Sequence, residues 1–372
     1  MNKDAKKLIE ELLSLTEVTI NGDKPYDIKV HNDNFYERVI KEESLGLGES
    51  YMEGWWDCDS VDELINKILR AKLDKKVAGN WKIKLHYLKA RLFNLQKDKK
   101  SFNKLMKHHY NLGNDLFKAM LDKRMNYSSA YWKNAKNLDE AQEAKLELIC
   151  KKLVLKKGMS VLDLGCGWGG FAKYAAEKYG VKVVGVTISK EQYELGKELV
   201  KGFPVEIKSQ DYREVTGKFD RIISIGSIEH VGYKNYRTYM EVVNRTLKDD
   251  GISLIHTIGS NKSQVASNAW ITKYIFPVGL VPSVAQLSKA MEGIFVFEDL
   301  QNFGPDYDKT LMNWYKNFKN AWPKLKNKYT ETFYRMWKYY LLSSAGGFRS
   351  RQTQLWQIVM TKPGRELPLR IS

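Results

Sequence analysis

Asp163-Leu164-Gly165-Cys166-Gly167-Trp168-Gly169-Gly170 is the stretch that decides the fold of this 372-residue chain. It continues the apolar segment 160–164, which predicts a buried strand, and it leads into 169–180, which predicts a helix that ends at Gly180. Glycines permit a tight turn and let the backbone approach a ligand closely. The stretch therefore predicts a ligand-binding loop between a strand and a helix.

Alternating strand and helix patterns extend from this loop toward the C-terminus. Apolar runs predict further strands at 181–189, 205–211, 221–227 and 251–259, and residues 190–203 predict a helix between the first two of these strands. This order is typical of a parallel sheet covered by helices on both faces. We expect an α/β protein with a Rossmann-like domain and a smaller N-terminal α+β domain.

Candidate ligand residues follow the ends of the predicted strands. The second strand lacks an acidic residue to bind a ribose, but Thr187, Ser189 and Gln192 offer hydroxyl and amide groups. Asp211 follows the third strand, where it could accept from an adenine amino group or serve instead as a helix cap or turn residue. With Asp163 just before the first glycine, the loop resembles the first motif of class I S-adenosylmethionine-dependent methyltransferases.

The N-terminal part of the chain has a different character. Residues 18–30 predict two strands around an Asn-Gly-Asp turn. Residues 71–107 carry 12 Lys and Arg against two acidic residues, with apolar residues at helical spacing. This pattern fits either a hinge helix packed on its own domain or a helix on a membrane surface. We expect a lipid-binding domain at 1–90, a basic linker at 91–105 and a catalytic domain at 106–372.

The overall composition restricts the partners and the compartment. The net charge of +17 indicates a polyanionic partner, either nucleic acid or an anionic membrane surface. Three widely spaced cysteines form no disulfide or metal-binding pattern, as expected in a reducing compartment. The N-terminus is too charged for a signal peptide, and Lys273, Pro277 and Pro282 interrupt the apolar stretch 270–287. We expect a cytoplasmic protein that is soluble or peripheral on the membrane.

Six further motifs narrow the family. They are HHYNLGNDLF (108–117), MNYSSAYW (125–132), SIEHVG (227–232), IHTIG (255–259), DYDKTLMNWYKNF (306–318) and GGFRSRQTQLWQIV (346–359). From about residue 102 to the C-terminus, the chain resembles the cyclopropane-fatty-acyl-phospholipid synthases and their mycolic-acid-modifying relatives. This resemblance implies methylene transfer from S-adenosylmethionine to the double bond of an unsaturated acyl chain in a membrane phospholipid. It also implies a carbocation that a bound bicarbonate ion deprotonates.

The resemblance assigns the bicarbonate site to Glu229, His256, the backbone of Ile258, the hydroxyl of Tyr307 and residue 129. Family members commonly have Cys where this chain has Ser129, but a hydroxyl can still bind an oxyanion, so we expect activity to persist. Protonation of Glu229, or a proton shared with His256, would relieve the repulsion of the anion. Without the resemblance, the pair could be a capping network and His256 a core residue.

The expected S-adenosylmethionine site combines the residues implied by the resemblance with those at the strand ends. They are Tyr127, Ser128, Asp163, Gly165, Cys166, Gly167, Thr187, Ile188, Ser189, Gln192, Asp211 and Tyr212. The cofactors expected are therefore S-adenosylmethionine and bicarbonate, and no metal site is expected.

Two other functions are compatible with a basic chain of this fold. A nucleic-acid base methyltransferase is disfavoured because the chain has no Pro-Cys pair and its fourth strand ends in SIEHVG rather than an amine-methylating motif. A catalytically silent lipid-binding protein is disfavoured by the glycine loop, Glu229 and His256. We expect the partner to be anionic membrane phospholipid at the inner face of the membrane, with no nucleic acid. The resemblance further suggests a homodimer.

Overall fold

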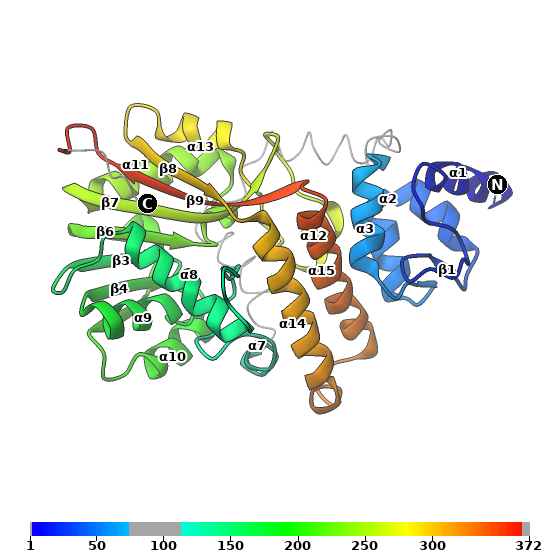
Figure 1. Cartoon of the computed structure of the whole chain (residues 1–372), viewed down its shortest axis with the longest axis horizontal. Helices are drawn as coiled ribbons and strands as arrows, with labels where there is room; N and C mark the ends of the chain where they lie inside the picture. The colour runs from blue at the N-terminus through cyan, green and yellow to red at the C-terminus, as the bar shows by residue number, and fades with distance from the viewer. Residues whose placement is uncertain (1, 74–112, 367–372) are drawn as a thin grey trace. The chain divides into compact units, whose positions relative to one another are not determined.

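The computed structural model describes residues 2–73 and 113–366 and divides them into two compact units (Figure 1). The first unit combines residues 2–73 with Ala266–Pro277 and Tyr307–Thr353. The second combines residues 113–265 with Val278–Asp306 and residues 354–366. Each unit is therefore assembled from segments that are distant in sequence. The predicted linker at 91–105 and nearly all of the basic segment lie outside the described residues, so the domain boundaries stay predictions.

The second unit is built on a seven-stranded sheet with the order β5-β4-β3-β6-β7-β9-β8. Its strands are β3 (Ser160–Leu164), β4 (Lys182–Thr187), β5 (Val205–Ser209), β6 (Phe219–Ile225), β7 (Leu247–Ser260), β8 (Val296–Asn302) and β9 (Thr353–Thr361). Strands β3 to β7 pair in parallel, and β8 is antiparallel to β9. The chain runs from β3 to β5 on one side and resumes at β6 on the other. The loops after β3 and β6 therefore lie at the topological switch point, where open α/β sheets bind ligands.

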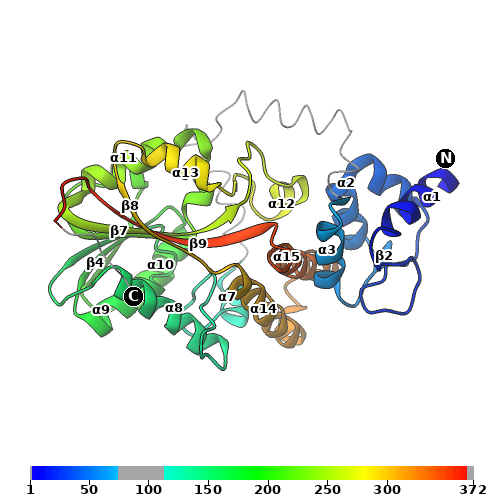
Figure 2. The same ribbon diagram turned by 45° about the horizontal axis from the view of Figure 1, so that its top comes forward.

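Helices cover both faces of this sheet, as Figures 1 and 2 show. One apolar cluster joins α8 and α9 to the sheet, and a second joins α11 and α13 to it. The helices are α7 (Asn114–Met120), α8 (Leu138–Lys152), α9 (Gly170–Tyr179), α10 (Lys190–Leu199), α11 (Tyr236–Thr246) and α13 (Val284–Met291), with 3₁₀ turns η1 (Tyr212–Glu214), η2 (Ile228–His230) and η3 (Tyr233–Asn235). The predicted Rossmann-like fold is confirmed, and Gly180 caps α9 in a left-handed conformation as expected.

The first unit is mainly helical. It comprises α1 (Asn2–Leu13), β1 (Lys29–Val30), α2 (Asn34–Met52), β2 (Trp56–Asp57), α3 (Val61–Arg70), α12 (Ala269–Tyr274), most of α14 (Gly304–Leu325) and α15 (Glu331–Arg349). Arg335 of α15 donates to the Asp57 carboxylate at 2.7 Å, and Arg349 joins Asp62 to Asp308. These charge pairs link the N-terminal segment to helices from the C-terminal half. In the described part of the chain, no helix is both long and apolar enough to cross a membrane.

The two strands predicted for residues 18–30 around an Asn-Gly-Asp turn form only in part. Ile20 and Ile28 form an isolated parallel bridge, and Lys29–Val30 pair instead with Trp56–Asp57. The buried Asp27 carboxylate accepts from the backbone N–H groups of Thr19 and Lys24 at 2.8 and 2.9 Å. A side chain therefore supplies bonds that a hairpin would have taken from a facing strand.

Candidate active site

The glycine loop between β3 and α9 leaves backbone open to a cavity. Gly165, Gly167 and Gly169 have φ values of +83°, +56° and +82°, which few other residues adopt. A Cβ atom on Gly165 would lie 2.5 Å from the Ser227 hydroxyl, whereas one on Gly167 would meet no atom within 4 Å. The first glycine is thus required by packing, and the second exposes main chain on which a ligand can lie.

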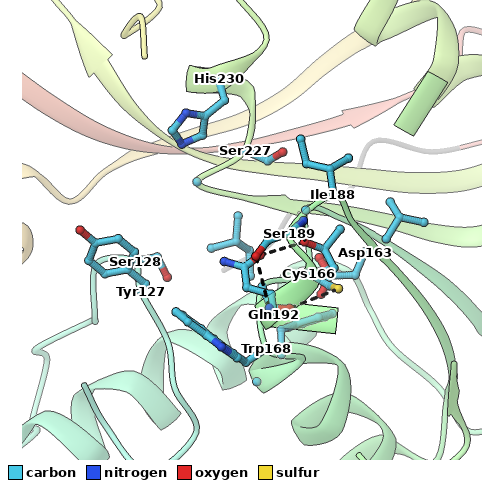
Figure 3. A pocket seen from close by; sticks show the side chains of 18 of the residues that line it. Tyr127, Ser128, Asp163, Cys166, Trp168, Ile188, Ser189, Gln192, Ser227 and His230 are labelled. Atoms are coloured by element: carbon cyan, nitrogen blue, oxygen red, sulfur yellow. Dashed lines mark hydrogen bonds between the residues drawn. The ribbon is translucent and has the colours of Figure 1, made fainter. Parts of the chain in front are cut away.

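All twelve residues predicted to bind S-adenosylmethionine line one cavity at this edge of the sheet (Figure 3). They come from the loop before α8, the glycine loop, the end of β4 and the segment after β5. Figure 3 shows Tyr127 and Ser128 on one side, with Ser189 and Gln192 on the other. Lining residues that the sequence analysis did not identify include Asn126, Trp168, Gln210, Ser227 and His230. The structure gathers the predicted set, and the assignment of a ligand to it remains a prediction.

The end of β4 and the start of α10 form one polar wall of the cavity. Thr187 donates its hydroxyl to Gln192 Oε1 at 2.8 Å and accepts from the Ser189 backbone N–H at 3.2 Å. Ser189 also caps α10 by accepting from the Gln192 backbone N–H. Because the Thr187 hydroxyl already donates to the side-chain oxygen of Gln192, the amide NH₂ group of Gln192 is the polar group that remains for a ligand.

Two aspartates that line the cavity, Asp163 and Asp211, differ in the hydrogen bonds that their carboxylate oxygens accept. Asp163 is 1% exposed, and its Oδ1 has no hydrogen-bond partner. Burial raises the pKa of Asp163 to about 7, although the positive charge of Lys145 opposes this shift. Asp211 caps η1 and binds the Arg213 guanidinium at 2.9 and 2.7 Å. The capping alternative for Asp211 is confirmed, and its contact with adenine remains a prediction.

The opposite wall of the cavity is carried by a loop anchored to α8. The Ser128 carbonyl accepts from Gln142 Nε2 at 2.8 Å, and its hydroxyl accepts from Lys145 Nζ at 3.1 Å. The Tyr127 ring packs edge-on against Phe117 with centroids 5.1 Å apart. Sequence analysis missed Gln142 and Lys145, which are both buried. Their spacing of three residues places them on one side of a helix, which was the available signal.

A second buried polar cluster lies where β6 and β7 meet. Glu229, in η2, accepts from the Ile258 backbone N–H at 2.8 Å through Oε1, while its Oε2 is buried without a partner. Burial raises the pKa of Glu229 to about 7, although the Ile258 N–H opposes the shift. Its neighbours Ser227 and His230 line the cavity, whereas Glu229 itself is not among the lining residues. The carboxyl group is therefore poised to be protonated or ionised near neutral pH.

His256 stands two residues before Ile258 in β7, and successive even positions of a strand share a face. Its Nδ1 accepts from Gln357 Nε2 of β9 at 3.2 Å, which leaves the ring proton on Nε2. That Nε2 is buried and has no hydrogen-bond partner. Burial holds the pKa of His256 well below its usual range, and the positive charges of Lys145 and Lys152 act in the same direction. The imidazole is therefore a neutral donor.

Four of the five predicted anion-binding residues, Ser129, Glu229, His256 and Ile258, belong to the second unit. Ser129 is fully buried and donates its hydroxyl to the Ala130 carbonyl at 3.0 Å. Tyr307 belongs to the first unit, where its ring packs on Phe348. The Glu229–Ile258 hydrogen bond joins two of the five directly. The parts of Ser129 and Tyr307 in an anion site stay predictions.

The possible metal-ligating side chains of residues 2–73 and 113–366 form no cluster. There, no group of three or more His, Cys, Asp or Glu side chains is arranged to hold a metal ion. Cys58, Cys150 and Cys166 are buried and unpaired, and burial raises the pKa of the Cys166 thiol, which faces the cavity.

Comparison with known proteins gives a consistent picture. Residues 96–358 match the family described as mycolic acid cyclopropane synthetase. The chain is 53% identical over 366 residues to cyclopropane-fatty-acyl-phospholipid synthase of Escherichia coli K12, covering 98% of this chain and 95% of that one. A mycolic acid cyclopropane synthase, CmaA1, solved with S-adenosylhomocysteine and CTAB superposes with a TM-score of 0.65 and 32% identity, covering 70% of this chain and 98% of the other. The cyclopropane synthase MmaA2 of Mycobacterium tuberculosis gives the same TM-score and coverage at 28% identity.

Proposed function

The chain belongs to the mycolic acid cyclopropane synthetase family, and on this premise we propose that it converts unsaturated acyl chains of membrane phospholipids to cyclopropane acyl chains. It is a methyltransferase with the class I fold, and S-adenosylmethionine is the donor. The observation that carries the proposal is the 53% identity along 98% of the chain, because it extends through both compact units.

The residues that line the cavity fit S-adenosylmethionine. Gly167 exposes backbone on which the ligand can lie. Asp163 offers an unpartnered carboxylate oxygen to an ammonium group. Thr187, Ser189 and Gln192 form a polar wall. S-Adenosylmethionine would supply an electrophilic methyl carbon, one hydrogen of which must leave as a proton before the ring closes. The protein therefore has to orient the donor at the glycine loop and to receive one proton.

We place the bicarbonate that would receive that proton at Glu229 and His256, two buried groups that the family resemblance assigns to one anion site; the Glu229–His256 cluster is this proposed pair. Among the buried side-chain atoms without a hydrogen-bond partner are Glu229 Oε2 and His256 Nε2. Because Gln357 donates to His256 Nδ1, the imidazole can donate from Nε2, and protonated Glu229 can donate from Oε2. An anion would supply the acceptor that these two buried donors lack. Its binding would therefore remove much of the free-energy cost of leaving them without a hydrogen bond.

Lipid mass spectrometry tests the proposed function. Purified protein incubated with S-adenosylmethionine and vesicles of monounsaturated phosphatidylglycerol should add one CH₂ per modified acyl chain and release S-adenosylhomocysteine. Saturated vesicles are the control and should remain unchanged because they offer no double bond. Methyl label that enters RNA while the lipid stays unlabelled would contradict the proposal.

We also propose that the basic segment 71–107 binds anionic lipid, and that the protein acts as a homodimer without a nucleic-acid partner. Changing Lys82, Lys84, Lys89 and Lys97 to Glu should weaken binding to anionic vesicles by up to about 1 kcal/mol per charge removed near the surface. The matched control changes four exposed lysines of the second unit, Lys156, Lys190, Lys197 and Lys201. Equal losses of vesicle binding in the two variants would indicate a general attraction between charges and not a specific role of the basic segment.

Light scattering tests the proposed homodimer by measuring the mass of the protein in solution.

A further inference from the structure

A lysine lies fully buried on the inner face of α8, behind the wall of the cavity. Lys145 is 1% exposed, and its ammonium donates to the Ser128 hydroxyl at 3.1 Å. A buried ammonium is costly unless polar or charged groups compensate it, so such a lysine is rarely placed by packing alone. Lys145 does not line the cavity, and it reaches the cavity through Ser128.

One turn earlier on the same helix, Gln142 makes the second contact with the same residue. It is fully buried, and its Nε2 donates to the Ser128 carbonyl at 2.8 Å. The helix thus holds Ser128 at both its side-chain and its main-chain oxygen. This fixes the Tyr127–Ser128 wall of the cavity against a rigid element (Figure 3).

Lys145 is also the cation that acts on the unpartnered acid of the glycine loop. Asp163 and Asp122 are the carboxylates that stabilise its charge, and His256 also lies within reach of its field. Asp122 is already bonded by the backbone N–H groups of Arg124 and Asn126, whereas Asp163 Oδ1 has no partner. Burial alone would favour neutral Asp163, and the ammonium opposes this.

We propose that Lys145 is a positioning residue of the donor site, which fixes Ser128 in the wall of the cavity and brings a positive charge near Asp163, the acid that would bind a ligand's ammonium group. The methionine portion of S-adenosylmethionine has that chemistry. The assignment rests on the proposed function for the identity of the ligand. It extends that function by giving a role to a side chain that does not line the cavity.

The first test measures S-adenosylhomocysteine binding by calorimetry, without lipid. Lys145→Met removes the charge and keeps an unbranched side chain that is one heavy atom shorter. It should weaken binding about 10- to 100-fold, as expected for losing hydrogen bonds to a charged group. In assays of lipid methylation, KM for S-adenosylmethionine should rise by a similar factor while kcat changes only a few-fold.

Lys152→Met is the matched control. Lys152 lies two turns later on α8, is equally buried and pairs with Asp299 of β8 at 3.0 Å, away from the cavity lining. Its removal should lower the melting temperature and leave the affinity for S-adenosylhomocysteine within about twofold. If both variants weaken binding equally, the effect comes from destabilising α8 and the proposal is overturned.

The pH dependence separates an electrostatic role from a packing role. Burial raises the pKa of Asp163 to about 7 and lowers that of Lys145 to about 8. Affinity in the wild type should therefore fall as the pH drops through about 7 and Asp163 is protonated. In Lys145→Met this midpoint should move to higher pH, because a nearby positive charge no longer favours the carboxylate. Lys145→Arg should restore the midpoint, and Asp163→Asn should abolish this transition, which excludes Asp122 and His256 as its source.

Lys145→Gln covers the case in which the methionine variant does not fold. It can still donate to Ser128 but carries no charge, so it should shift the midpoint with a smaller loss of affinity. An unchanged midpoint in this variant would overturn the proposal. Wild-type protein that binds S-adenosylhomocysteine but does not modify lipid would contradict only the proposed function. Failure of the wild type to bind would overturn both.

Discussion

Glu229→Gln is expected to reduce turnover about 10²- to 10⁴-fold, the usual contribution of general acid–base assistance. Glutamine keeps the acceptor for the Ile258 N–H but cannot exchange a proton at the unpartnered Oε2 position. His256→Ala should cause a similar loss because it removes the donor at Nε2. Steady-state rates of cyclopropane formation measure both effects. Affinity for S-adenosylhomocysteine should stay within about threefold, since neither residue lines the cavity.

The same substitution should make the protein more stable at alkaline pH. Burial raises the pKa of Glu229 from 4.5 to about 7, so between these values the folded state binds more protons than the unfolded state. The stability of the wild type therefore falls as the pH rises from about 4.5 to 7, and above 7 the buried carboxylate costs about 3 kcal/mol. Glutamine carries no such cost. Urea unfolding at pH 8 should show Glu229→Gln to be the more stable protein, and an exposed change such as Glu292→Gln should have no effect.

Dependence on bicarbonate decides whether the cluster holds the proposed anion. Wild-type turnover should fall in buffer stripped of carbon dioxide and return when bicarbonate is added, whereas Glu229→Gln should not recover. Turnover of Glu229→Gln within a few-fold of wild type would remove this residue from the chemistry. Wild-type activity that is indifferent to bicarbonate would leave the Glu229–His256 cluster without its proposed ligand.

Gly165→Ala is expected to weaken S-adenosylhomocysteine binding about 100-fold. At φ +83° an alanine is strained by roughly 1–2 kcal/mol, and its Cβ would lie 2.5 Å from the Ser227 hydroxyl, so the loop must move. Displacement of about 1 Å in a binding loop is enough for losses of this size. Calorimetry gives the affinity, and thermal unfolding gives the accompanying loss of stability.

Gly158→Ala separates backbone strain from the contact. Gly158 also has a positive φ, +87°, but a Cβ there would meet no atom within 4 Å, and the residue does not line the cavity. This variant should lose stability through strain alone and bind S-adenosylhomocysteine as the wild type does. Comparable affinity losses in the two variants would show that the strain, and not the displaced loop, weakens binding.

Much of the sheet could be predicted from local signals. The run 160–164, the glycines that follow it and the helix ending at Gly180 each depend on neighbours in sequence, and the structure contains them as expected. The twelve predicted ligand residues gather in one cavity because the carboxyl ends of parallel strands share an edge. The strands predicted within residues 18–30 form only in part, because Asp27 bonds backbone N–H groups that the strand pattern assigns to a partner strand.

The sequence by itself determined the alternation of strands and helices, the glycine loop and the residue types of the donor site, because hydrophobic period and turn chemistry act over a few residues. Only the tertiary structure decided that Lys145 is buried behind Ser128, that Gln357 sets the tautomer of His256, and that α12, α14 and α15 complete the N-terminal unit. A polar residue on a helix is solvated or buried according to what packs against it. Those neighbours come from segments far along the chain, which a local pattern does not encode.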